Sequence, residues 1–129
     1  MNGHLLDTNV AIIASVRSVS LSSESREAIA RGPNFLSVVS YWEVMLKSMK
    51  GTLKVGVPRT WWLDTLDQLA ATPLPLRPEH INSVFHLLAI HQDPFDRALI
   101  AQAMVEDLTL ITTDGLIPRY ASERFRVIV

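Results

Sequence analysis

The feature that most constrains the fold is the alternation of short, apolar, strand-like runs with longer helical segments. Neighbouring parallel strands need a long crossover between them, and a helix packed on the sheet is its usual form. The alternation therefore predicts an α/β protein, a three-layer α/β/α sandwich with a mostly parallel central sheet. The expected strands are residues 4–6, 35–39, 108–112 and 126–129, with a proline-containing edge strand at 72–76.

Helical periodicity occupies the segments between the strands. In residues 40–50, apolar side chains fall at i, i+3, i+4 and i+7, which predicts the buried stripe of a helix. A helix that opens at Pro78 shows a similar stripe. The two stripes are Trp42, Met45, Leu46 and Met49, and Ile81, Val84, Phe85 and Leu88.

The last long helix has a different pattern. It is expected to begin at Pro94 and to run to about Glu106. Its segment 98–105 is apolar except for Gln102. A helix that is apolar on all sides is a buried helix, so we expect this one to lie almost wholly in the core.

Length and composition limit the class of protein. With 129 residues, 48% of them hydrophobic, the chain is expected to form one domain over residues 1–129. The absence of cysteine excludes a disulfide scaffold and a thiolate zinc site. His4, His80 and His86 have no ligand-like mutual spacing, and His91 is expected in a loop. No apolar run is long enough to span a membrane and no signal peptide is visible, so we expect a cytoplasmic protein without membrane contact.

Four carboxylates occupy positions next to strand ends. Because the carboxyl ends of parallel strands meet at one edge of a sheet, functional side chains gather there. The first acid follows the first strand, the second and third lie near the starts of helices, and the fourth follows the strand that ends at Thr112. These acids are Asp7, Glu43, Asp96 and Asp114.

Each acid alone also has a structural explanation. Glu43 stands three residues after Ser40, the spacing of a capping box, and Asp96 stands in a first helical turn behind an Asp93 N-cap. Asp7 and Asp114 could cap short helices. Four carboxylates at one edge would nevertheless repel one another unless a cation held them, and Mg²⁺ or Mn²⁺ suits such oxygen ligands. Together the acids favour a metal site that activates water for phosphoryl chemistry.

Four segments resemble the motifs of PIN-domain ribonucleases, most of all the toxin of VapBC-type (type II) toxin–antitoxin pairs. The resemblance spans residues 5–120 with the motifs in family order, and the third segment is the most specific. The segments are LLDTN, SYWEVMLK, DPFDRALIAQA and TTDGLIPRY.

The resemblance implies a metal-dependent endoribonuclease that leaves a 5′-phosphate and a 3′-hydroxyl and is inhibited by a cognate antitoxin. It also implies Mg²⁺ or Mn²⁺ as the cofactor. The implied catalytic and metal-binding residues are Asp7, Glu43, Asp96 and Asp114, and the implied supporting residues are Thr8, Asn9 and Thr112.

Three basic residues near the acids are candidates for binding RNA phosphates: Lys47, Lys50 and Arg97. Lys47 could instead form an i,i+4 pair with Glu43 or orient that carboxylate, and Arg97 could form a surface ion pair. Trp61 falls on the polar side of a helix, where an exposed tryptophan would indicate an antitoxin or homodimer contact, whereas Trp62 is expected in the core.

Other functions remain to be weighed. A haloacid-dehalogenase-like phosphatase would carry an Asp where this chain has Asn9, and a receiver domain would carry paired acids ahead of Asp7. A non-catalytic PIN-like module that binds protein partners stays open. The net charge of −1 argues against RNA binding when taken alone. If metal neutralises four of the thirteen acids, the nine that remain face twelve Lys and Arg, a surplus of +3 that favours a phosphate backbone.

Overall fold

The parallel sheet predicted from the sequence is present. The computed structural model describes residues 2–89 and 93–129, so His91 lies outside the described residues. Within them, five strands form one sheet in the order β3-β2-β1-β4-β5, and all neighbouring strands pair in parallel. The strands are β1 (His4–Leu6), β2 (Asn34–Ser37), β3 (Ala71–Leu74), β4 (Thr109–Ile111) and β5 (Val127–Ile128).

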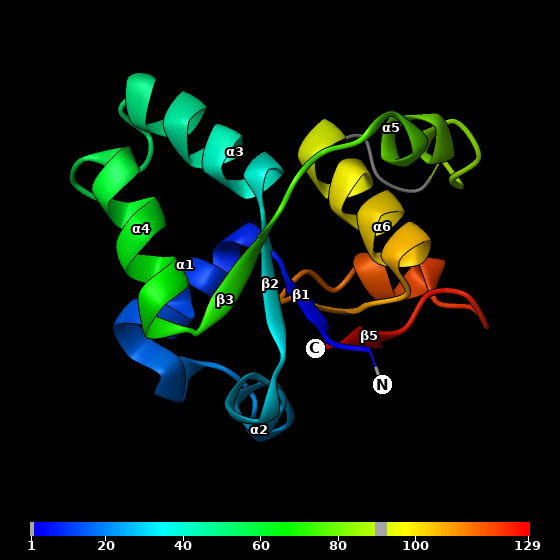
Figure 1. Ribbon diagram of the computed structural model, residues 1–129, viewed down its shortest axis with the longest axis horizontal. Coiled ribbons are helices and arrows are strands. Elements are labelled where there is room, and N and C mark those ends of the chain that lie inside the picture. The colour runs from blue at the N-terminus through cyan, green and yellow to red at the C-terminus, as the bar shows by residue number, and fades with distance from the viewer. Residues whose placement is uncertain (1, 90–92) are drawn as a thin grey trace.

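Helices cover both faces of this sheet, which confirms the three-layer α/β/α architecture. In Figure 1, α1 and α4 lie on one side of the strands and α6 lies on the other. No helix of the described residues is long and apolar enough to cross a membrane. The helices are α1 (Thr8–Arg17), α2 (Ser23–Arg31), α3 (Val38–Met49), α4 (Pro58–Gln68), α5 (Pro78–Val84) and α6 (Pro94–Glu106), with short 3₁₀ turns η1 (Ser18–Ser20) and η2 (Ile117–Tyr120).

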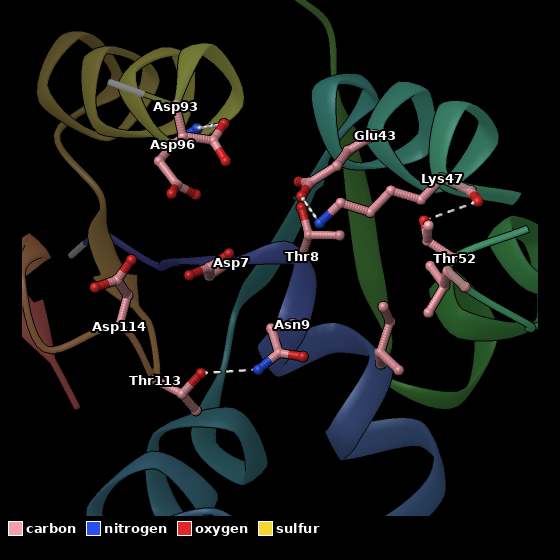
Figure 2. A pocket seen from close by; sticks show the side chains of 12 residues that line it. Asp7, Thr8, Asn9, Glu43, Lys47, Thr52, Asp93, Asp96, Thr113 and Asp114 are labelled. Atoms are coloured by element: carbon pink, nitrogen blue, oxygen red, sulfur yellow. Dashed lines mark hydrogen bonds and ion pairs between the residues drawn. The ribbon is translucent and has the colours of Figure 1, made fainter. Parts of the chain in front are cut away.

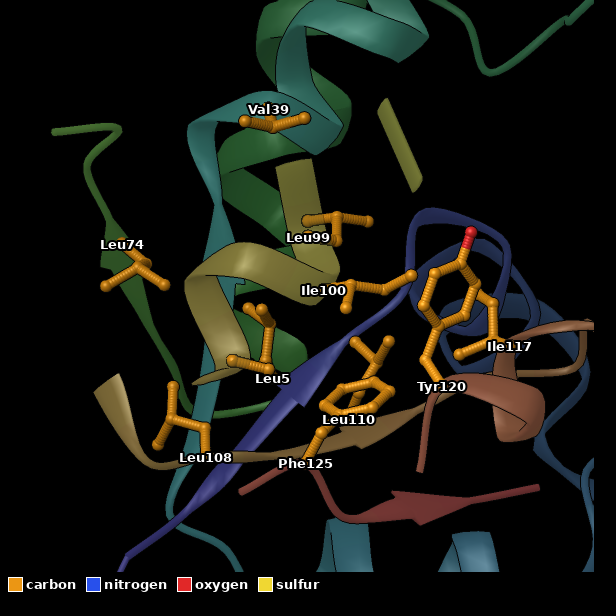
Figure 3. Packing of buried hydrophobic residues seen from close by; sticks show 11 residues of the cluster. Leu5, Val39, Leu74, Leu99, Ile100, Leu108, Leu110, Ile117, Tyr120 and Phe125 are labelled. Atoms are coloured by element: carbon orange, nitrogen blue, oxygen red, sulfur yellow. The ribbon is translucent and has the colours of Figure 1, made fainter. Parts of the chain in front are cut away.

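Two hydrophobic clusters fill the space between sheet and helices. Successive side chains of a strand point to opposite faces, so Leu5 belongs to one cluster and Leu6 to the other. Leu110 and Ile111 of β4 divide in the same way. Figure 3 shows the first cluster, in which α6 and η2 pack on the sheet. The second cluster lies under α1, α2 and α4.

Helix α6 forms as predicted, from Pro94 to Glu106. Its central residues 99–103 are buried, whereas Val105 near its end is 39% exposed. The buried Gln102 accepts the Ser37 hydroxyl at 2.5 Å and donates to the Pro75 carbonyl at 3.2 Å. One polar side chain thereby ties α6 to the end of β2 and to the segment after β3.

The predicted start of α3 and its buried stripe were wrong. The helix begins at Val38 because the Ser37 hydroxyl caps it, accepting the Val39 amide at 2.9 Å. Trp42 is 57% exposed and Met49 is 76% exposed, while Glu43 is buried. The helix is therefore rotated about its axis relative to the prediction. It turns Glu43, rather than its most apolar face, toward the carboxyl edge of the sheet.

The stripe predicted for α5 was also wrong. This helix ends at Val84, so Phe85 lies beyond it and is 86% exposed. Ile81 and Leu88 are exposed as well. The buried side chain is His80, which contacts a Glu106 oxygen of α6 at 2.7 Å. This polar pair joins the two helices, together with the bond from the Arg97 guanidinium of α6 to the Val84 carbonyl at the end of α5.

Trp61 was predicted to be exposed, and it is buried. Both tryptophans of α4 are 8% exposed and belong to the second cluster. The ring of Trp62 stacks on Tyr41, with 4.9 Å between the ring centroids. Helix α4 therefore packs through adjacent residues of one turn, which widens its buried face to include Trp61.

Candidate active site

A pocket of about 440 Å³ lies at the carboxyl edge of the sheet, where the acids were expected to meet. Figure 2 shows Asp7 in its middle, between Asp114 on one side and Glu43 on the other. Asp96 faces the same space from α6. All four predicted acids therefore line one pocket. The other lining residues are Thr8, Asn9, Ile12, Lys47, Thr52, Leu53, Asp93 and Thr113.

The hydroxyl of Thr112 links two of these acids. Thr112 follows β4, is fully buried, and donates to Asp7 Oδ2 at 2.5 Å. Oγ1 of Thr112 also accepts the backbone amide of Asp114 at 3.0 Å. Asp114 in turn accepts the Leu116 amide at 2.8 Å, which closes the turn before η2. Thr112 was predicted to support the site, and its hydroxyl bonds the end of β4 directly to Asp7 at the end of β1.

Two further hydrogen bonds hold the start of α1 in the pocket wall. The Thr8 hydroxyl donates to the Ser40 hydroxyl of α3 at 2.8 Å, and both residues are buried. The Asn9 amide donates to the Thr113 hydroxyl at 3.0 Å. Because these bonds join α1 to α3 and to the segment after β4, the three elements that carry Asp7, Glu43 and Asp114 keep a fixed arrangement.

Glu43 does not form the predicted capping box with Ser40, because the N-cap of α3 is Ser37. The Glu43 side chain instead contacts Lys47 Nζ through Oε2 at 2.7 Å. Its second oxygen, Oε1, is buried and has no hydrogen-bond partner within the described residues. A buried carboxylate oxygen without a donor is costly, which makes it a good ligand for a cation.

Asp93 does two things at the start of α6. As predicted, it caps the helix, since its Oδ1 accepts the amides of Phe95 at 2.8 Å and Asp96 at 3.4 Å. It also lines the pocket, although the sequence predicted only a helix cap at this position. The segment Asp93-Pro94-Phe95-Asp96 thus brings two carboxylates to the pocket from the first turn of α6.

Two of the three predicted phosphate-binding residues lie elsewhere. Lys47 lines the pocket, whereas Lys50 is exposed at the C-cap of α3 and does not. The guanidinium of Arg97 donates to the carbonyls of Leu88 at 2.8 Å and Val84 at 3.2 Å, beyond the pocket lining. RNA contacts by Lys50 and Arg97 stay predictions.

Nothing in the sequence marks some of the residues in and around the pocket as functional. Ile12 and Leu53 are apolar, and Thr113 is a common polar residue outside the recognised acids. Ser40, which bonds to Thr8 behind the pocket wall, is a common polar residue as well. Thr52 reaches the pocket because its amide and hydroxyl both donate to the Lys47 carbonyl, which folds the end of α3 back. Their positions depend on which helix faces lie together, and so on tertiary packing.

The pocket suits a hard divalent cation bound partly through water. Its donors are carboxylates, and Glu43 Oε1 lacks a partner. Within the described residues, no three His, Asp or Glu side chains lie close enough to hold a metal ion directly. Mg²⁺ commonly keeps several waters and binds through one or two carboxylates, so direct contact with three of these side chains is not required.

The family of the chain follows from a comparison with known domains. The family model of the PIN domain matches residues 4–123, and the chain therefore belongs to the PIN domain family. No curated protein matches the chain.

Several solved structures from VapBC systems share this fold. A DNA-bound VapBC from Salmonella typhimurium matches with a TM-score of 0.71 at 16% identity, covering 99% of this chain and 98% of that one. VapBC2 from Rickettsia felis, bound to a promoter DNA fragment, matches at 0.69 and 13%, covering 97% and 96%. VapBC-5 from Mycobacterium tuberculosis matches at 0.61 and 20%, covering 97% and 96%. At these identities the likeness shows a shared fold.

The environment of Asp7 leads to a prediction about stability. Burial raises the pKa of Asp7, the Thr112 hydroxyl lowers it, and the Glu43 carboxylate raises it again, with a net increase above 3.8. The unfolded chain thus loses this proton at lower pH than the folded chain. The contribution of Asp7 to stability should fall as pH rises from 3.8 through its folded pKa, because the fold then contains a buried charge.

We therefore expect Asp7→Asn to stabilise the metal-free chain at pH 7, by roughly 1 kcal/mol, a typical gain on relieving a functional site. Urea unfolding in EDTA measures this, and the gain should disappear below pH 3.8. Asp64→Asn, on the exposed side of α4, is the control and should change little. A destabilised Asp7→Asn at pH 7 would contradict the prediction.

Proposed function

We propose that this PIN-domain chain is a Mg²⁺- or Mn²⁺-dependent endoribonuclease and the toxin of a VapBC-type pair acting in the cytoplasm. PIN domains are generally nucleases. The observation that carries the proposal is the meeting of Asp7, Glu43, Asp96 and Asp114 in one pocket at the carboxyl edge of the sheet.

In this proposal each residue of the pocket has a defined task. Asp7 and Glu43 supply buried carboxylate oxygens, and Asp96 and Asp114 supply oxygens from the opposite wall. Thr112 holds Asp7 through its hydroxyl, while Thr8 and Asn9 fix the start of α1. A divalent cation bound there would supply an activated water and stabilise the charge that develops at phosphorus. The products that the family resemblance implies are a 5′-phosphate and a 3′-hydroxyl.

The charge of the chain supports an RNA substrate once the acids are neutralised. Without the four proposed ligands, nine acids face twelve Lys and Arg. A positive surplus favours contact with phosphates, and Lys47, Lys50 and Arg97 are the proposed contacts. The acids that oppose RNA in the bare chain are the ones that a cation would neutralise.

The first test is hydrolysis of RNA. Purified chain should cleave mixed RNA with Mg²⁺ or Mn²⁺ and not with EDTA, as followed by gel electrophoresis. Asp7→Asn and Asp96→Asn should each lower the rate at least about 100-fold, because each removes a charged ligand of the cation. Asp64→Asn should cleave like the unmodified chain.

Two results would contradict the ribonuclease proposal. Cleavage that persists in EDTA or in Asp7→Asn would exclude the metal mechanism. No cleavage of any RNA, together with intact folding, would favour the alternative of a non-catalytic module that binds protein partners.

A groove between α1 and α4 supports the proposed antitoxin partner. It has a volume of about 310 Å³, and Val16 and Val57 on its lining are 76% and 64% exposed. Trp61 also lines it, and its indole Nε1 has no hydrogen-bond partner within the described residues. An extended peptide could cover the valines and offer a carbonyl to the indole. Although Trp61 is buried, it would thus still contribute to the antitoxin contact.

The groove can be tested with a charge on an exposed position. Val57→Asp should weaken inhibition by a co-expressed candidate antitoxin at least about tenfold, because binding would bury an unpaired carboxylate. RNA cleavage measures inhibition, and Val129→Asp, on the exposed C-terminal residue, is the control. Equal inhibition of both variants would place the antitoxin elsewhere.

A different apolar surface supports the proposed homodimer. Trp42 of α3 is 57% exposed and stands edge-on to Phe95 of α6, with 5.3 Å between ring centroids. Ile81 of α5 and Phe85 just after it are also largely exposed, and α5 packs on α6. Large exposed apolar side chains of this kind commonly mark protein interfaces.

We expect Trp42→Asp to convert a homodimer to monomer, since it places a charge in the buried centre of the contact. Light scattering after size-exclusion chromatography measures the mass. Leu63→Asp, at an exposed position of α4, should leave the dimer intact. A Trp42→Asp chain that keeps its mass as a dimer would show that this surface is not the interface.

A further inference from the structure

Lys47 lies inside the acid pocket in a position that its expected contact with RNA does not explain. It is one turn beyond Glu43 on α3, and its Nζ lies 2.7 Å from Glu43 Oε2 (Figure 2). The Glu43 side chain is only 7% exposed, whereas that of Lys47 is 49% exposed. The ammonium therefore reaches from solvent onto a buried carboxylate.

The surroundings of this ammonium are strongly acidic. Five carboxylates line the pocket, and Lys47 alone among the described lining residues is basic. The bond to Glu43 raises the pKa of Lys47, and the carboxylates of Asp93 and Asp96 add to the increase. Lys47 therefore carries its charge at neutral pH. Its charge interacts with Asp93 and Asp96 as well as with Glu43, which it contacts.

The two oxygens of Glu43 differ in a way that matters for a cation. Oε2 bonds to Lys47, while the buried Oε1 has no partner within the described residues. A divalent cation would thus find one oxygen of Glu43 available and a positive charge beside the other. Like charges at such short range oppose one another, and the pocket interior screens them less than water does.

We propose that Lys47 is the resident counter-cation of the acid pocket, which stabilises the metal-free chain and limits its affinity for the divalent cation. This inference rests on the proposed metal site. It differs from the two simpler roles of Lys47. An orienting residue would strengthen metal binding, and a residue that only contacts RNA would leave metal binding in the absence of RNA unchanged.

The test compares Lys47→Gln with Lys50→Gln, which removes the same charge from the same helix outside the pocket lining. Glutamine keeps an N–H donor that Glu43 can accept and removes the charge, on a side chain that is one bond shorter. Isothermal titration with Mn²⁺, without RNA, should give about three- to tenfold tighter binding for Lys47→Gln, as expected for one charge at short range. Lys50→Gln should bind Mn²⁺ like the unmodified chain.

Thermal unfolding in EDTA supplies a second readout that needs no metal. Lys47→Gln should have a lower Tm than Lys50→Gln, because the acids lose their counter-charge, and Mn²⁺ should raise its Tm by more. Lys47→Arg should restore both properties.

The outcomes separate this inference from the proposed function. Weaker or unchanged Mn²⁺ binding in Lys47→Gln, with binding to the unmodified chain intact, would overturn the counter-cation role alone. Absence of Mn²⁺ binding to the unmodified chain would overturn the metal site and this inference together.

Discussion

The parallel pairing of β1 with β2 on one side and with β4 on the other determines where the acids of this chain can meet. Parallel strands end at the same edge, so the residues that follow them enter one region of space although they are far apart in sequence. Asp7 follows β1 directly, and Asp114 follows β4. The helices that leave or return to this edge add Glu43 and Asp96. Every later feature of the pocket depends on this common edge.

The edge brings together groups that repel one another, and the surrounding structure holds them there. Burial and the Glu43 carboxylate raise the pKa of Asp7, while Thr112 offsets part of that cost. The bonds of Thr8 and Asn9 attach α1 to its neighbours. Gln102 fixes α6 to the end of β2. Such a site is less stable than an apolar one would be, as is common where an acid environment serves a function.

The same packing leaves apolar side chains in solvent. Helix α3 presents Glu43 to the pocket, and Trp42 on its neighbouring face is therefore exposed. Helix α5 is anchored to α6 by His80 and Glu106, which leaves Ile81 and Phe85 outside. The orientation that assembles the pocket is thus also the one that creates the surface we propose for self-association. The rotations of α3 and α5 thus affect both the acid pocket and the exposed apolar surface.

By itself the sequence determined the alternation of strands and helices, the parallel sheet, the bounds of α6 and the placement of four acids at strand ends. These features follow from local rules: β-branched runs, caps, prolines and the direction of parallel strands. Tertiary structure alone decided that α3 faces the pocket with Glu43, that Trp61 is buried, that Lys47 bonds to Glu43 and that Arg97 caps carbonyls near α5. Periodicity tells which residues share a face of a helix, but the face that turns inward depends on all the partners that compete for it.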